Sequence, residues 1–556
     1  MTRNLSSFIS LANLAVLSVS PNVFASSDRA PWLMPYDIDQ PSRNDAAVIQ
    51  PSQEQIYEFA WDTFIALNWP YLEKDASGQA GLRGQPDHSA PAVSIQGEAA
   101  QCGDAETTVS PIVVWETYMT PGDVFIDNPD PQNYPVKWGA PEFLDLENGL
   151  KALRAKSYRA PYGQYFADGI NQPYTHANVP TGPVVDQNGH YLRYEVTLNQ
   201  AYFNYIAFYK YFSADVQKAA VRTFLEYAWK YQKAPPVTAN GNYFQPVPKG
   251  DEAFIPGPDY AQQGLVEIKA AWKILELGGD NPDIPERYLR RCMEITLPSG
   301  SMIERLVGLV GFHIHRVTPN GHLPSTFEQV DNVELSRRRD DPLPLPKTPS
   351  LNPGRKWTYY RHAETFPKIS FWPGKRWPPT LPSAASYPNG YEVDGLSGQP
   401  GLIPLAFLAD EPLPTREERP SINISRVTPI PLEVRKVNRR YQGMWRDSVL
   451  RYYQLIGAQN RSGSTDKNPN VAPNPYLGPG IPNEDLGPGI PGPQYSTTSS
   501  LVNTTLESYT QGGWSCARCH INAFPQGVEV FPPFESQFAD LHVMSFLLRN
   551  AQPEAK

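Results

Sequence analysis

Long apolar runs are missing from the sequence beyond Ala25. The longest, Leu306 to Phe312, has seven residues and includes two glycines, whereas a membrane-spanning helix needs about 20 consecutive apolar residues. We therefore expect the mature chain to be soluble, with no membrane-spanning segment.

Positive charge is also scarce. From Ser26 onward, 47 Lys and Arg stand against 57 Asp and Glu, a net charge of −10, because Arg3 is the only charged side chain before that point. No basic cluster exceeds short runs such as Arg337 to Arg339. Nucleic acid and anionic membranes are therefore poor candidates as partners.

The N-terminus, from Met1 to Ala25, follows the plan of a secretory signal peptide. Arg3 precedes an apolar run from Leu5 to Val19, and the small-residue ending Val23-Phe24-Ala25 predicts cleavage after Ala25. We expect an exported protein that is soluble in the periplasm.

Cysteine is rare, with four residues in 556. Two of them, Cys102 and Cys292, lie far apart in the sequence. In an oxidising compartment a disulfide between them is the favoured interpretation, and two free buried thiols are the alternative.

The composition predicts an α+β fold with many loops. Apolar residues make up 40% of the chain, enough for a sizeable core, while the 59 prolines are about twice the average usage. We expect a large mixed body over residues 26–460, a Pro/Gly-rich linker or arm over 461–496, and a short, mostly helical segment over 497–556. The linker contains the hexapeptide Leu-Gly-Pro-Gly-Ile-Pro twice.

Periodicity predicts several elements of the body. Apolar spacing indicates helices over Ser52 to Trp69 and Ala214 to Tyr231. Alternating or β-branched stretches predict strands, which lie at Ile112 to Tyr118, His190 to Leu198, Gly264 to Leu275 and Arg305 to Val317.

The C-terminal segment contains the motif that carries chemistry. Cys516 and Cys519 are three positions apart, and His520 follows at once. This spacing suits covalent haem attachment, because each thiol adds to one vinyl group and the adjacent histidine then lies under the iron.

Through this motif and the export signal, the chain resembles the c-type cytochromes. The resemblance covers about 60 residues and implies one covalent haem c, with His520 as the proximal iron ligand. The chain departs from the family in having only 36 residues after His520. We therefore expect the large body to supply one wall of the haem site.

The motif has three other interpretations. A zinc site needs further ligands, and no second cysteine pair of this spacing exists. A dithiol redox site usually follows a strand, whereas Ser508 to Trp514 resembles a turn. The third is an ordinary disulfide with an accidental match.

The distal iron ligand has several candidates. A helical pattern over Ser536 to Arg549 places Met544 and His542 on different faces, so only one of them can face the iron. Met544 is preferred because methionine opposite histidine is the family pattern and suits electron transfer. Core packing of Met544, a ligand from the body and an open site are the alternatives.

A second, weaker candidate site lies in the body. His313 and His315 are two apart on a predicted strand and should share the face opposite Phe312 and Ile314. His322, Glu328 or Asp331 would complete a metal site there, or one of the two histidines would approach the haem. Hydrogen-bonded structural histidines are the commoner case.

These patterns favour an electron-transfer protein that binds one haem and has a periplasmic or membrane redox partner. Oxidoreductase chemistry in the large body is an extension of this hypothesis. A non-catalytic haem protein that binds or senses a ligand is the second hypothesis, and a zinc-stabilised structural protein is the third. No residue pattern identifies a substrate.

Overall fold

The computed structural model describes residues 53–95, 109–139, 190–231, 264–278, 282–296, 302–318, 321–333, 430–459, 503–506 and 547–554, with shorter pieces between them. Within these ranges the fold is α+β, as predicted: helices lie against a six-stranded antiparallel sheet. The predicted signal peptide, Met1 to Ala25, lies outside the described residues.

The sheet is built around one long strand, β8 (Met302–Thr318). One edge of β8 pairs with β6 (Val266–Ile274). Its other edge pairs with β7 (Arg290–Thr296) along its first half and with β9 (Gly321–Gln329) along its second half. Strand β5 (Arg193–Leu198) extends the sheet beyond β6, and β12 (Tyr453–Ala458) extends it beyond β9.

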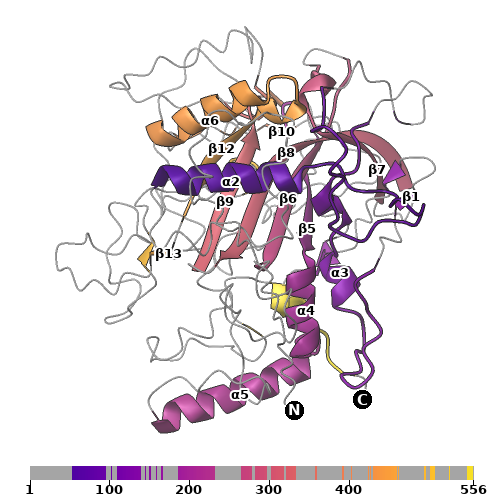
Figure 1. Cartoon of the computed structure of the whole chain (residues 1–556), viewed down its shortest axis with the longest axis vertical. Coiled ribbons are helices and arrows are strands. Elements are labelled where there is room, and N and C mark those ends of the chain that lie inside the picture. Colours follow the sequence, from indigo (N-terminus) through magenta and orange to yellow (C-terminus); the bar gives the residue numbers. More distant parts are fainter. Residues whose placement is uncertain are drawn as a thin grey trace, which may run out of the picture.

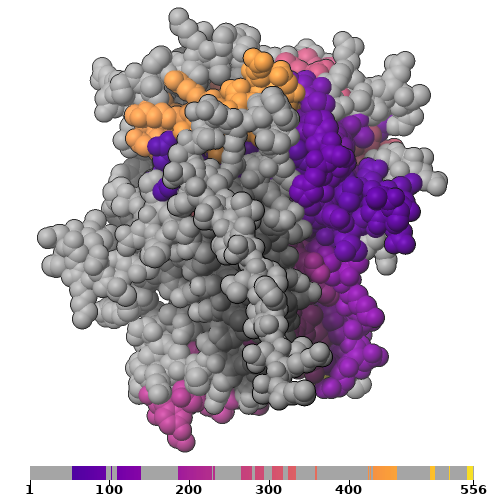
Figure 2. Space-filling view, viewed as in Figure 1, coloured from indigo at the N-terminus to yellow at the C-terminus, as the bar shows by residue number. Residues whose placement is uncertain are grey.

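Helices α2 (Gln53–Leu67) and α6 (Leu432–Met444) cover one face of this sheet (Figure 1). Helices α4 (Gln200–Phe208) and α5 (Ala214–Tyr231) lie beyond the lower end of the strands in that view. In the space-filling view α6 is at the top and residues of the 53–139 region form one side (Figure 2). The helical ranges predicted for α2 and α5 are confirmed.

The remaining elements are short. They are α3 (Pro121–Val124), the 3-10 helices η2 (Val114–Thr117), η4 (Pro285–Arg287), η6 (Val449–Tyr452) and η11 (Leu547–Asn550), and the two-stranded pairs β1 (Leu144–Asp145) with β2 (Leu150–Lys151), β3 (Tyr158–Arg159) with β4 (Tyr165–Phe166), β10 (Tyr391–Glu392) with β11 (Leu402–Ile403), and β13 (Arg461–Ser462) with β14 (Gln494–Tyr495). The β13–β14 pair joins the two ends of the predicted linker, which therefore lie side by side.

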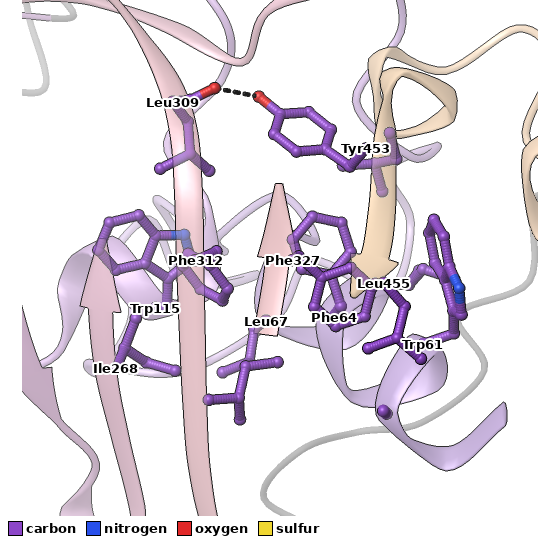
Figure 3. Packing of buried hydrophobic residues seen from close by; sticks show 14 of the residues in the cluster. Trp61, Phe64, Leu67, Trp115, Ile268, Leu309, Phe312, Phe327, Tyr453 and Leu455 are labelled. Atoms are coloured by element: carbon purple, nitrogen blue, oxygen red, sulfur yellow. Dashed lines mark hydrogen bonds between the residues drawn. The ribbon is translucent and has the colours of Figure 1, made fainter. Parts of the chain in front are cut away.

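The main core lies between the sheet and α2. Phe64 of α2 stacks on Phe327 of β9 at 4.2 Å between ring centroids and meets Phe312 of β8 edge-on at 5.5 Å (Figure 3). Helix α2 is buried nearly all round because α6 covers its other side: Asn438 of α6 accepts a hydrogen bond from Trp61 Nε1 at 2.8 Å. Such a helix carries apolar residues on every face.

One predicted strand is wrong. Residues 112 to 118 form the 3-10 helix η2 and a single bridge between Pro70 and Val113. The Glu116 carboxylate accepts the Val113 backbone N–H at 3.0 Å and forms a buried ion pair with Arg291 of β7. These tertiary contacts outweigh the β propensity of the stretch.

Replacing Phe64 with alanine is expected to lower the free energy of unfolding by about 3–5 kcal/mol, because it opens a cavity among fully buried rings. Denaturant unfolding followed by far-UV circular dichroism measures this change. Leu82→Ala, at a side chain that is 59% exposed, is the control and should change it by less than about 0.5 kcal/mol. Equal effects of the two changes would contradict this core.

Candidate functional site

Four titratable side chains share the sheet face that α2 and α6 do not cover. Lys269 of β6 is the register partner of His313 of β8, and Glu267 is the partner of His315. Phe312 and Ile314, which alternate with the histidines, belong to the main core on the other face. Because successive strand residues point to opposite faces, the four form one group, here called the β6–β8 quartet.

The quartet is largely removed from solvent. Glu267 is 4% exposed, Lys269 8% and His315 9%, while His313 is half-buried. The Nδ1 atom of His315 lies 3.9 Å from the Glu267 carboxylate. With neutral histidines, one lysine and one glutamate balance in charge, which limits the cost of burying charged groups.

Residues 503–506 are fixed to the same face, next to the quartet. Asn503 Nδ2 donates at 2.8 Å to Thr326 Oγ1, and Thr326 of β9 is the register partner of His313. The backbone N–H of Thr504 donates to Glu328 at 2.6 Å. These bonds place the start of the 497–556 segment directly beside β8.

A glycine on β8 permits this close approach. A Cβ atom added at Gly311 would lie 2.0 Å from Thr505 Oγ1, a distance that no side chain tolerates. On the far side, the hydroxyl of Tyr194 of β5 donates to the Thr505 carbonyl at 2.9 Å. Residues 503–505 therefore reach from β9 across β8 toward β5.

The C-terminal end of the segment is also fixed to the body. Leu547 and Leu548 are fully buried in a cluster with side chains of α4 and α5. The same cluster includes Val196 and Leu198 of β5, which are the register partners of Lys269 and Glu267. Gln217 of α5 donates to the Leu548 carbonyl at 2.9 Å.

Two other predicted partners of the histidines are paired with arginines in the structure. Glu328 forms a buried ion pair with Arg426, and Asp331 pairs with Arg287 at 2.6 Å. Strand β9 is an inner strand between β8 and β12, and Glu328 is fully buried. His322 lies near the start of β9, opposite Val317.

Sequence reasoning missed Glu267 and Lys269. Their alternation with Val266 and Ile268 predicts the strand correctly. The same alternation is typical of a strand whose polar face is exposed to solvent, so it does not indicate a buried group. Only the register of β6 against β8 brings them to the histidines. Cys516, Cys519, His520, His542 and Met544 all lie outside the described residues.

The disulfide between Cys102 and Cys292 is confirmed, with a Cα–Cα distance of 5.7 Å. Within the described part of the chain, these two sulfurs and a Glu304 oxygen are the one group of three potential metal-ligand atoms lying within 4.8 Å of one another. Metal binding needs thiolates, so this group is a covalent link between distant segments and offers no metal site while the disulfide is intact.

A second buried charge cluster lies at the other end of β6. Lys273 Nζ is 3.3 Å from the Asp186 carboxylate and 2.6 Å from that of Asp283. Desolvation by burial acts to lower the pKa of Lys273, but the two carboxylates outweigh it and raise that pKa. Because Asp283 also accepts the backbone N–H of Glu276 at 2.8 Å, the cluster fixes the chain after β6 and has a structural role.

Lys273→Met should therefore destabilise the fold by about 3–5 kcal/mol, since it leaves two buried carboxylates without a cation. Burial raises the pKa of the Asp283 carboxyl, and Lys273 opposes this shift, so the pKa rises further in the variant. Acidification toward pH 4 protonates Asp283 more readily in the folded variant than in its unfolded state, so the deficit relative to the wild type shrinks there. Thermal unfolding at pH 4 and pH 7 measures both effects, and a deficit that is the same at the two pH values would contradict the cluster.

No helix in the described ranges is long and apolar enough to cross a membrane. The chain matches no family model, no curated protein sequence and no solved structure.

Proposed function

We propose that this protein is a monohaem c protein that transfers single electrons in the periplasm. The observation that carries the proposal is the spacing of Cys516, Cys519 and His520. The cysteines would hold the porphyrin through thioether bonds, and His520 would be the proximal iron ligand. When bound, the haem supplies an iron that cycles between the ferrous and ferric states.

The disulfide supports this use of the motif. The chain has four cysteines, and Cys102 and Cys292 are bonded to each other. Cys516 and Cys519 are therefore the remaining pair, and neither has a partner among the other cysteines of the chain. A structural disulfide also fits an exported protein, because such bonds persist in oxidising compartments, where c-type haems are attached.

The fixed ends of the segment support a haem site that the body helps to form. Residues 503–506 are hydrogen-bonded to the sheet, and Leu547 is buried against α4 and α5. The two described ends of the 497–556 segment therefore both lie against the body.

The size of the body suggests a role beyond carrying haem. An electron carrier needs little more than its haem pocket, and the sheet with its helices is far larger. We propose that the protein exchanges electrons with a soluble or membrane redox partner. This exchange would be coupled to the oxidation of a small molecule bound to the body.

Cys516→Ala is expected to abolish the covalent haem. The protein is produced with its signal peptide in a host that attaches c-type haem, and a pyridine haemochrome spectrum is recorded before and after acid-acetone extraction. The wild type should keep its haem after extraction, because thioether bonds resist it. The variant should lose most of it.

The double variant Cys102→Ala/Cys292→Ala is the matched control. It removes the disulfide, should cost about 2–5 kcal/mol of stability, and should retain the covalent haem. A wild-type protein without haem, or one holding zinc in place of iron, would contradict the proposal.

Met544→His should lower the reduction potential of the haem, because methionine as distal ligand raises that potential. Potentiometric titration followed in the visible spectrum measures it. His542→Gln is the control and should leave the potential nearly unchanged. A wild-type ferrous iron that is five-coordinate and binds carbon monoxide would exclude Met544 as ligand and favour a ligand-sensing haem protein.

A further inference from the structure

Lys273, near the end of β6, contacts two carboxylates in a place from which water is excluded. Its Nζ atom lies 3.3 Å from Asp186 Oδ2 and 2.6 Å from Asp283 Oδ2. None of the three side chains is more than 8% exposed. An amine and two carboxyl groups therefore meet at one nitrogen atom, shielded from bulk solvent.

The cation of this cluster is a lysine, whereas three other buried carboxylates of the described ranges pair with arginines. These carboxylates are Glu116, Glu328 and Asp331. A guanidinium stays charged when it is buried and does not act as a nucleophile, but a buried lysine amine can lose its proton and attack a carbonyl carbon. Lys273 therefore has a reactivity that the arginines lack.

Asp186 is held as the electrophile of such a reaction. Its Oδ1 atom accepts the backbone N–H groups of Asn188 and His190, each at 2.9 Å. Two backbone donors on one oxygen stabilise the negative charge that develops there when a nucleophile adds to the carboxyl carbon. The Oδ2 atom lies next to Lys273 and has no other hydrogen-bond partner among the described residues, so it is the oxygen that is able to leave.

Asp283 is placed to move the protons. Both of its carboxylate oxygens accept hydrogen bonds from Lys273 Nζ, at 2.7 and 2.6 Å. Burial raises the pKa of Asp283, although Lys273 opposes this shift, so this carboxylate takes up a proton more readily than an exposed one. A carboxyl group in contact with the amine can act first as general base and then as general acid.

We propose that Lys273 and Asp186 form an intramolecular isopeptide bond. Nζ of Lys273 attacks the carboxyl carbon of Asp186, the bond from this carbon to Oδ2 breaks, and one water molecule leaves. Asp283 carries two protons in turn from Nζ to Oδ2 and ends as the carboxylate that it was at the start. An ammonium and a carboxylate become a neutral amide and water, so atoms and charge balance without a further reactant.

The bond closes a covalent loop over residues 186–273, which contains β5, α4 and α5. Burial favours the product, because a neutral amide loses less hydration in the interior than an ammonium and a carboxylate do. The closed loop restricts the unfolded chain and so stabilises the fold in the same way as a disulfide. This cross-link does not depend on the proposed haem.

Tandem mass spectrometry of the denatured, trypsin-digested wild type tests the proposal. The bond blocks cleavage after Lys273, so the expected product is peptide 270–287 joined to peptide 160–193, with the mass of their sum less one water molecule. Unlinked peptides 160–193, 270–273 and 274–287 would overturn the proposal. Loss of water within peptide 270–287 alone would mean that Lys273 reacts with Asp283, which also overturns it.

Asp283→Asn tests the proton carrier separately, because it keeps both reacting groups and removes the base. The bond should then form about 100-fold more slowly, the smaller end of what general acid–base catalysis contributes, and the freshly purified variant should give mainly unlinked peptides. Asp331→Asn is the matched control, since it removes a buried carboxylate that pairs with Arg287, and it should keep the link. Equal linkage in the two variants would overturn the role of Asp283, while the digest of the wild type decides the bond itself even if a variant does not fold.

Discussion

The two-residue alternation of the long strand β8 is the constraint on which the rest of the structure depends. It directs Phe312 and Ile314 into the core under α2, and it directs His313 and His315 to the other face. A register slip of one residue would exchange the two sets, burying imidazoles among aromatic rings. Pairing with β6, β7 and β9 along the length of β8 fixes the register and therefore defines both faces at once.

The two faces have different energetics. The face under α2 is stabilised by close aromatic packing, as between Phe64 and Phe327. The other face carries an apolar cluster, which contains the Cys102–Cys292 disulfide. It also carries buried charged groups whose partners come from distant segments of the chain. Arg426 reaches Glu328 there, and residues 503–506 bind beside it. This second face therefore binds the chain segment that precedes the proposed haem motif.

Sequence patterns predicted the elements whose own residues decide their structure. Helices α2 and α5, strands β5, β6 and β8 and the disulfide follow from periodicity and cysteine count, whereas α4, α6, β7 and β12 were missed. Gly457 weakens the strand pattern of β12, which is stabilised by its pairing with β9. Likewise, Glu267 and Lys269 alternate with apolar residues as in any half-exposed strand. They lie opposite His315 and His313 only because of the register between β6 and β8, which β7 separates in the sequence.

The Cys516 to His520 motif needs no fold to be recognised, and the segment that carries it has both of its described ends against the body. The proposed function depends on one haem bound covalently through Cys516 and Cys519. Intact-mass spectrometry of the protein after signal-peptide removal measures this. We expect the mass of the polypeptide plus one haem, with the added mass on the peptide that contains both cysteines. A mass equal to that of the polypeptide alone, from a host that attaches haem to other c-type proteins, would contradict it.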